Sequence, residues 1–232
     1  MSILTEAPLQ IYSSGLLFSP QVSIVRKTFI RQVPQAVKLL SGRVEEWNAW
    51  RSVLEGHSKA VSAVVFSHDG QLLASASNDN TVRVWETATG QCRSVLEGHS
   101  DWVSAVVFSP DRQLLASASR DSTVRVWETA TGQCRSVLEG HPYIYRIAFS
   151  PDGRRLETDK SDISLPSGLV TASTISHPDG LSSIAVTKKW IVRQNRRFLW
   201  LPPEYRNYTT AVFKYMVCLG CNDGRVTLLS FC

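Results

Sequence analysis

The sequence predicts an all-β fold, because a segment of 42 residues that reads as four short strands occurs twice in succession. Residues 51–92 and 93–134 differ at only six positions, and a third copy begins with the same letters, RSVLEGH, at residue 135 before it diverges. Each full copy carries Gly-His near its start and Trp-Glu at the end of its third apolar run. A period in the low forties with these marks is typical of a β-propeller, whose small four-stranded blades bury their faces against one another.

Four strands are expected in order within each copy. In the first copy, Val61–Phe66 is an apolar and β-branched run that ends at the turn sequence Ser-His-Asp-Gly. Leu72–Ser77 follows and ends at Asn-Asp-Asn, residue types that tolerate left-handed backbone. Residues 81–86 alternate apolar and polar side chains, and after Thr-Ala-Thr-Gly the chain enters the fourth strand, Cys92–Leu96.

These repeats resemble those of the WD40 family, and the resemblance covers residues 51–153 directly. It implies that a His, a Ser or Thr, an Asp and a Trp form a hydrogen-bonded chain within each blade. The matching residues are His57, Ser75, Asp79 and Trp85 in the first copy, and His99, Ser117, Asp121 and Trp127 in the second. Ser77 and Ser119 face the same way and are alternatives for the Ser position.

The third copy matches the WD40 pattern only in part. It keeps His141, and Thr158 and Asp162 fall in register after a deletion of one residue. Gly168 then stands where Trp is expected, so the resemblance implies a third blade that is degraded or has changed its role.

The flanking segments carry a narrower resemblance. Residues 7–26 are similar to the segment that precedes the repeats in fungal NACHT–WD40 proteins, which are NLR-like receptors that include vegetative-incompatibility proteins. Residues 198–206 and 224–231 are similar to that family's closing segment. No GxxxxGK[ST] loop is present, so the resemblance is to the sensor end of such a receptor without its NACHT NTPase. A truncated, non-functional receptor remnant is the alternative.

The flanks are also blade-like in their own residues. Residues 13–18 resemble the first strand of a repeat, and residues 219–229 echo the segment from Ser75 to Trp85, with Asp223 at the turn and Leu229 at the Trp position. Together with the repeats they give a β-propeller of about five blades, irregular or incomplete at its ends. The expected organisation is a pre-repeat segment at 1–50, repeats over 51–153 with a partial third copy at 135–168, and divergent closing blades at 169–232.

The charge distribution disfavours nucleic acid as a partner. The net charge is +5, but Lys and Arg number 9 against 11 Asp and Glu in residues 51–153, and 11 against 6 in residues 154–232. A basic groove across the repeats is therefore not expected. Residues 188–197 (KKWIVRQNRR) hold five basic residues and no acidic one, which leaves a nucleic-acid-associated protein as an alternative. We favour the plainer interpretation, two strands joined by a turn with solvated charges.

No pattern predicts an enzyme, a cofactor, a metal or a small-molecule substrate. Three of the five histidines occupy the repeated Gly-His position, and HExxH, GxSxG and Gly-rich phosphate loops are absent. Cys218 and Cys221 form a lone CxxC, and residues three apart in a strand face opposite sides. Because the first residues lack a basic and apolar signal pattern and no apolar run nears the roughly 18 residues of a membrane helix, we expect a cytoplasmic protein with reduced thiols, the nucleus not being excluded.

The six positions that differ between the two full copies predict the binding face. Four of them lie in the loops before the first strand and between the second and third strands, which open on one rim of a blade. The two others, His68/Pro110 and Gly70/Arg112, belong to the opposite face. Drift at exposed loops is the alternative explanation, but it does not account for the bias to one rim.

We therefore expect a non-catalytic protein–protein interaction scaffold, and open blade edges also allow oligomerisation. Trp and Arg are enriched in interface hot spots, so Trp102 and Arg120 should dominate the contact. The expected partner-binding face consists of Lys59, Ala60, Asn78, Asn80, Asp101, Trp102, Arg120, Ser122 and, from the third copy, Tyr143.

Overall fold

The all-β class is confirmed by the structure, a computed structural model. It describes residues 37–39, 53–141, 143–169, 184–187, 189–193, 196–201 and 209–231. Within these ranges every regular element is a β-strand, apart from one turn of 3-10 helix at Ser167–Leu169. The expected blade-like run at 13–18 and nearly all of the pre-repeat segment lie outside the described residues.

The two full repeats form two matching antiparallel sheets, here called blade 1 and blade 2. Blade 1 consists of β3 (Val61–Phe66), β4 (Leu72–Ser77), β5 (Val82–Glu86) and β6 (Cys92–Leu96). Blade 2 consists of β7 (Val103–Phe108), β8 (Leu114–Ser119), β9 (Thr123–Glu128) and β10 (Cys134–Glu139). The strands lie side by side in sequence order, as a meander, and the four strands expected for the first copy are all observed, the third beginning one residue later than predicted.

Three further sheets are described, which agrees with the expected number of about five blades. The third blade has β11 (Ile147–Phe149), β12 (Arg155–Thr158) and β13 (Ile163–Ser164). A fourth sheet has β14 (Ile184–Val186), β15 (Trp190–Arg193) and β16 (Arg196–Trp200). The closing sheet has β17 (Thr209–Phe213), β18 (Met216–Gly220) and β19 (Val226–Phe231).

The closing sheet joins early and late parts of the chain. Strands β1 (Val37–Leu39) and β2 (Val53–Leu54) both pair with β19. Leu229 lies opposite Val217 in this sheet, as Trp85 lies opposite Leu73 in blade 1. Residues 219–229 therefore share the strand register of the repeat as well as its sequence pattern.

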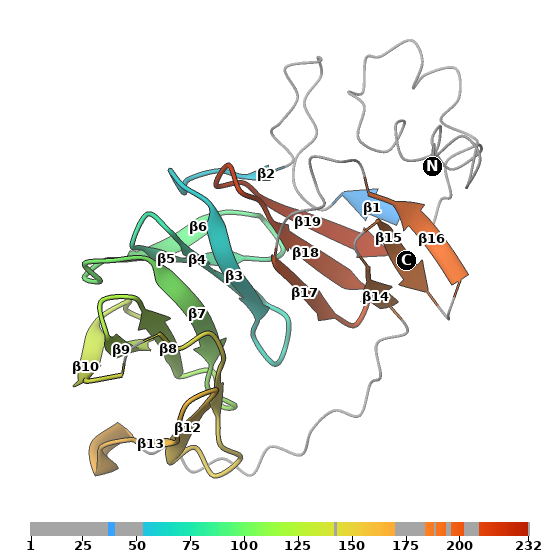
Figure 1. Cartoon of the computed structure of the whole chain (residues 1–232). Coiled ribbons are helices and arrows are strands. Elements are labelled where there is room, and N and C mark those ends of the chain that lie inside the picture. Colours follow the sequence, from blue (N-terminus) through green and yellow to red (C-terminus); the bar gives the residue numbers. More distant parts are fainter. Residues whose placement is uncertain are drawn as a thin grey trace, which may run out of the picture.

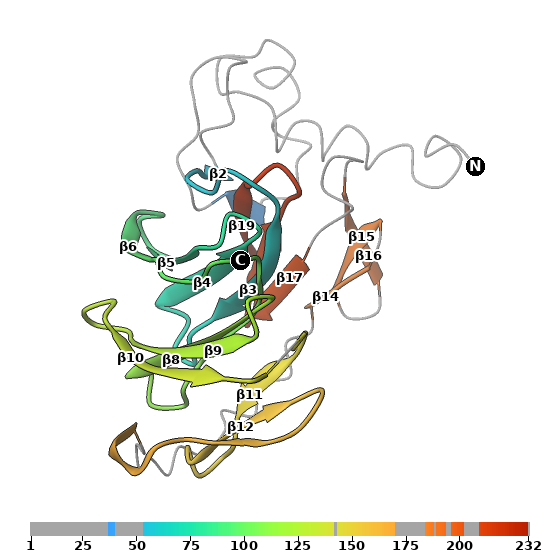
Figure 2. The same ribbon diagram turned by 60° about the vertical axis from the view of Figure 1, so that its left-hand side comes forward.

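The sheets succeed one another in an arc, from β14–β16 through the closing sheet and blades 1 and 2 to the third blade (Figures 1 and 2). Their first strands are neighbours: β17 contacts β3, β3 contacts β7, and β7 contacts β11. A repeated hydrogen bond links neighbouring blades. The Ser62 hydroxyl donates to the Val103 carbonyl, and the Ser104 hydroxyl donates to the Ile144 carbonyl at 2.5 Å. Tyr145 takes the place of these serines in the third blade, and 58% of its surface is exposed.

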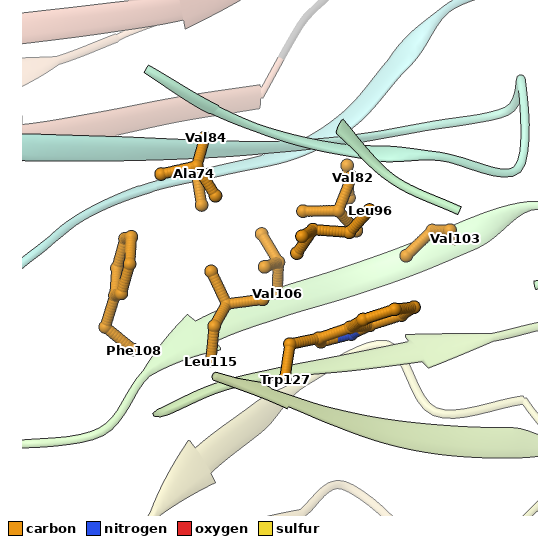
Figure 3. Packing of buried hydrophobic residues seen from close by; sticks show 10 residues of the cluster. Ala74, Val82, Val84, Leu96, Val103, Val106, Phe108, Leu115 and Trp127 are labelled. Atoms are coloured by element: carbon orange, nitrogen blue, oxygen red, sulfur yellow. The ribbon is translucent and has the colours of Figure 1, made fainter. Parts of the chain in front are cut away.

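The core lies between blades rather than within them. In the contact between blades 1 and 2 (Figure 3), Ala74 and Val84 of blade 1 face a set of larger side chains of blade 2 that includes Phe108, Leu115 and Trp127. Blade 2 repeats the arrangement toward the third blade, where its buried alanines meet Ile144, Leu156 and Ile163. Blades 1 and 2 thus each present small residues on one side and large ones on the other, so that the large side chains of one sheet pack against the small ones of its neighbour.

The third blade departs from the predicted alignment. Strands β12 and β13 are joined by a short turn, and Leu156 pairs with Ile163 just as Leu115 pairs with Trp127 in blade 2. Ile163 therefore takes the Trp place, and the prediction that Gly168 does so is wrong. Gly168 lies in the 3-10 turn beyond β13. The sequence alignment missed this because it assumed a turn of the same length as in the full repeats.

The basic stretch at 188–197 contributes two paired strands, as expected if it is a strand pair rather than a nucleic-acid site. Strands β15 and β16 pair from Trp190 opposite Trp200 to Arg193 opposite Arg196. Trp190 and Ile191 are buried, with 4% and 0% of their surface exposed, so this segment has an inward-facing apolar side. Lys188 and residues 194–195 lie outside the described residues.

The Gly70/Arg112 difference has a structural cause. Gly70 has a φ of 73°, and a Cβ at this residue would lie 2.2 Å from Cε1 of Phe213 in the closing sheet. Arg112 occupies the same turn of blade 2 with a φ of 64°, and its guanidinium pairs with the Asp69 carboxylate of blade 1. The same turn therefore meets an aromatic ring in one blade and a carboxylate in the other.

Exchanging these two residues should have unequal effects. Gly70→Arg forces a side chain into the space of Phe213 and should lower the free energy of unfolding by about 1–3 kcal/mol or more. Arg112→Gly removes an exposed ion pair, worth up to about 1 kcal/mol, but relieves left-handed backbone at a non-glycine residue, so its effect should stay within about 1 kcal/mol. Urea denaturation of the two single variants measures both values. Equal losses would contradict the assignment of Phe213 as the reason for glycine.

Candidate functional site

A buried chain of hydrogen bonds runs through each full blade. In blade 1 the Trp85 indole Nε1–H donates to Ser75 Oγ at 2.8 Å, and Ser75 Oγ lies 2.8 Å from His57 Nε2. The opposite ring nitrogen, His57 Nδ1, lies 2.9 Å from Asp79 Oδ2. Since the serine oxygen accepts from Trp85, its own proton goes to Nε2, and the imidazole proton resides on Nδ1. The four residues expected from the sequence are thus brought together in one chain.

Blade 2 repeats this geometry. Trp127 donates to Ser117 at 2.8 Å, Ser117 lies 2.8 Å from His99 Nε2, and His99 Nδ1 lies 2.8 Å from Asp121 Oδ2. His99 and Ser117 are buried, with 6% and 0% of their surface exposed. Because an unpaired polar group is costly at such a depth, every member of the chain depends on its neighbours.

A threonine that sequence reasoning did not single out extends each chain. The Thr81 hydroxyl donates to Asp79 Oδ1 at 2.7 Å, and its backbone N–H donates to the same oxygen at 3.0 Å. Thr123 does the same for Asp121 in blade 2. The available signal was the Asp-x-Thr spacing, which is typical of a turn in which the Asp side chain caps the backbone two residues on.

Ser77 and Ser119 have a different role from the one left open for them. The Ser77 hydroxyl donates to the Ala60 carbonyl at 2.9 Å and accepts from the Asp79 N–H at 3.1 Å. Ser119 Oγ donates to the Asp101 carbonyl at 2.8 Å. These serines hold the loop before the first strand against the loop after the second strand, and they do not reach the histidines.

Burial and hydrogen bonding set the charge states of the chain. Burial lowers the pKa of His57 and of His99 below the ordinary value of 6.5, although the neighbouring carboxylate opposes this. Burial opposes ionisation of Asp121, but hydrogen bonds from Thr123 and His99 outweigh it and lower its pKa to about 2. The native chain therefore holds neutral imidazole against ionised carboxylate near pH 7.

The third blade does not assemble this chain. Thr158 lies opposite Ile147 in the register of Ser117, but its hydroxyl donates to the Ser161 carbonyl at 2.7 Å. The Asp162 carboxylate lies 3.5 Å from the Arg155 guanidinium instead of meeting His141. The expectation that Asp162 falls in register is wrong, because the short turn before β13 directs this residue to Arg155.

The two loops expected to form the binding face are joined in both blades. The Asn78 N–H donates to the Ala60 carbonyl at 2.9 Å, and the Arg120 N–H donates to the Trp102 carbonyl at 2.9 Å. Asn80 and Ser122 follow in the turn with φ values of 72° and 66°. The eight loop positions named from the sequence thus lie on one rim, beside the Asp end of each buried chain.

Blade 2 places a stack of side chains on this rim. The guanidinium carbon of Arg120 lies 4.6 Å from the centre of the Trp102 ring and 5.2 Å from the centre of the Tyr143 ring. Both rings are exposed, Trp102 at 40% and Tyr143 at 48% of their surface. A guanidinium between two aromatic faces is held by cation–π attraction. This cluster, here called the Trp102–Arg120–Tyr143 stack, joins two of the repeats.

The sequence predicts each of these three residues on the binding face but does not predict that they contact one another. Trp102 and Arg120 were expected as separate contributors from blade 2, and Tyr143 as the contribution of the third copy. Their meeting depends on how far the third blade is rotated against blade 2, which the letters do not specify.

A hollow of about 630 Å³ opens between blades 1 and 2, on the face opposite to this rim. Three of its lining charges are paired: Asp69 pairs with Arg112 within the lining, and Glu128 pairs at 2.7 Å with Arg135, which lies outside it. The hollow is therefore less suited to a charged ligand than its composition suggests.

The described residues contain no group of three His, Cys, Asp or Glu side chains placed to hold a metal ion. Cys218 is fully buried, and burial raises its pKa well above 9.0, so this thiol is inert rather than nucleophilic. The described part of the chain also holds no helix with the length and apolarity that a membrane crossing requires.

The repeated four-stranded sheets, the core between them and the buried His-Ser-Asp-Trp chains define a propeller-type repeat protein. The family described as WD domain, G-beta repeat (WD40), matches residues 50–86, 90–128 and 132–180, more than half of the chain. The chain therefore belongs to the WD40-repeat family, as the sequence predicted. Members of this family generally act as non-enzymatic scaffolds for protein–protein interaction.

Known proteins similar to this chain match over short stretches. Vegetative incompatibility protein HET-E-1 of Podospora anserina is 44% identical over 88 residues, which is 38% of this chain and 6% of that protein. Protein Mut11 of Chlamydomonas reinhardtii is 65% identical over 37 residues, 16% of this chain and 10% of that protein. Probable cytosolic iron-sulfur protein assembly protein 1 of Scheffersomyces stipitis is 46% identical over 50 residues, 22% of this chain and 14% of that protein.

The chain thus covers only a small part of the length of these relatives. The first match confirms the resemblance to fungal WD40 proteins of the vegetative-incompatibility type. It covers 38% of this chain and does not extend to the activity of the whole relative.

Removing the central serine should test the buried chain. Ser75→Ala leaves both Trp85 Nε1–H and His57 Nε2 without a partner, and we expect a loss of at least about 2 kcal/mol in the free energy of unfolding. Thr158→Ala is the matched control at the same register of the third blade, where the hydroxyl only caps a turn, and should cost about 1 kcal/mol or less. Chemical denaturation compares the two. A larger loss for Thr158→Ala would show that the chain does not carry the stability assigned to it.

Stability should decrease on acidification in two steps. Unfolded histidine takes up a proton near its ordinary pKa of 6.5, whereas burial keeps His57 and His99 neutral to lower pH, so folding loses stability as pH falls below 6.5. A second loss between 3.8 and about 2 should follow as Asp121 is protonated. Denaturation midpoints from about pH 7.5 to about pH 5 measure the first step. His99→Asn should flatten that step, and a midpoint that rises on acidification would contradict it.

Proposed function

We propose that this protein is a non-catalytic recognition module that binds a partner protein through the rim formed by the paired loops of blades 1 and 2 and by Tyr143. The observation that carries the proposal is the exposed Trp102–Arg120–Tyr143 stack. Large aromatic and arginine side chains held together on a surface are the groups that contribute most to protein interfaces.

Comparison of the two repeats supports a role in binding rather than in folding. Blade 1 has the same strands, the same buried chain and the same loop pairing with Ala60 and Asn78 in place of Trp102 and Arg120. The scaffold therefore does not require the stack. Because the guanidinium is already ordered between two rings, less side-chain entropy is lost when a partner binds.

The kind of module is suggested by the relatives. The match to a vegetative incompatibility protein supports a role like the sensor part of a fungal NLR-like receptor. We place the module in the cytoplasm. Two equivalent cysteines, Cys92 and Cys134, are exposed and free, which suits a reducing compartment.

The test replaces the stack with the residues that blade 1 already carries. The double variant Trp102→Ala/Arg120→Asn should melt cooperatively like the parent chain but lose the proteins that the parent captures in a pull-down. Arg112→Gly, which also introduces the blade 1 residue but on the opposite face, is the matched control and should retain them. A folded double variant that still captures every partner would refute the proposed face.

A further inference from the structure

The third blade contains a histidine released from its usual partners. His57 and His99 each use both ring nitrogens in the buried chain. His141 stands at the same repeat position, but Thr158 and Asp162 are engaged with Ser161 and Arg155. Its backbone N–H donates to the Ser122 carbonyl at 3.0 Å, and its ring makes no hydrogen bond to any described residue.

A pocket of about 370 Å³ opens beside this histidine. In blade 2, the Asp121 carboxylate lies against the corresponding His99. In the third blade no carboxylate lines the pocket, and its lining includes His141, Lys160 and Ser161 together with Tyr143. The lining residues are Gly140, His141, Tyr143, Ile144, Lys160 and Ser161.

Tyr143 connects this pocket to the Trp102–Arg120–Tyr143 stack, because its ring lines the pocket and also lies 5.2 Å from the Arg120 guanidinium carbon. Arg120 forms no ion pair with a described carboxylate, so the edge of its guanidinium keeps N–H groups for a ligand. A guanidinium edge of this kind matches the two oxygens of a carboxylate. Two cationic side chains, Arg120 and Lys160, thus flank one aromatic wall.

The nearby carboxylates are largely engaged. Asp101 accepts the Trp102 N–H at 2.7 Å, and Asp159 accepts the backbone N–H groups of Tyr145 and Arg146 at 2.9 and 3.1 Å. Lys160 Nζ lies 4.0 Å from the Asp159 carboxylate, and 56% of its side chain is exposed, so this contact is weak and leaves the ammonium available.

We propose that the His141 pocket and the neighbouring Arg120 edge bind two carboxylates of a short acidic segment in a partner protein. One carboxylate enters the pocket against Lys160 and Ser161, and the other pairs with Arg120 across the Tyr143 ring. This rests on the proposed function, since it names the partner chemistry for the same rim. The near-neutral charge of residues 51–169, which include the pocket and hold 12 basic and 14 acidic residues, disfavours nucleic acid, which needs a line of cations rather than two.

The experiment measures binding of a fluorescent peptide of alternating Asp and Gly residues to the full chain, by anisotropy, beside the Asn–Gly peptide of equal length. The Asp peptide should bind and the Asn peptide should not. Lys160→Gln should weaken binding about fivefold, while Lys214→Gln, which removes an exposed cation of the closing sheet outside the proposed rim, should change it less than about twofold. Thermal melts confirm that both variants fold.

The outcomes separate this inference from the proposed face. No binding of the Asp peptide up to about 1 mM, which corresponds to about 4 kcal/mol, overturns the acidic partner, and so does tighter binding of a single-stranded DNA of matched charge. If the stack variant Trp102→Ala/Arg120→Asn loses captured proteins in either case, the face stands and only its chemistry is wrong. Binding that is equal in the Lys160→Gln and parent chains also overturns the pocket.

Discussion

The hydrogen-bonded chain from Trp85 through Ser75 and His57 to Asp79 connects the core between blades to the loops of the rim. At one end the indole lies in the core between blades, packed in the same cluster as residues of the closing sheet. At the other end the carboxylate binds the backbone of the loop before the first strand, at Ser58, and of the turn after the second, at Thr81. Because a half-satisfied buried network is unstable, the core and the rim are ordered together.

This coupling explains how two blades can share their strands and buried chain and still differ in their loops. The strands and the buried chain are the same in blades 1 and 2, and four of the six differences fall in the loops that the chain orders. On the rim the changes assemble the Trp102–Arg120–Tyr143 stack. On the opposite face they fit each turn to its neighbour, glycine beneath Phe213 and Arg112 beside Asp69. Drift is therefore not needed to account for the Gly70/Arg112 difference.

The third blade shows the consequence of losing the chain. A shortened turn replaces Trp with Ile163 in the core, where an apolar side chain still fills the space against blade 2. The polar half of the chain has no such substitute, so His141 lines an open pocket. Tyr145 stands where Ser62 and Ser104 bond to the following blade, and its side chain makes no such bond to a described residue. Packing tolerates a change of shape more readily than a network tolerates a missing partner.

The sequence by itself determined the all-β class, the four strands of each full repeat, the family and the members of each buried chain, because period, turn residues and repeated polar positions are local and recur. It also placed the variable loops on one rim. Only the tertiary structure decided that Arg120 lies between Trp102 and Tyr143, that Ile163 rather than Gly168 takes the Trp place, and that Gly70 is required by Phe213. These depend on the rotation between neighbouring blades and on one turn length, which are set by contacts between residues far apart in the chain.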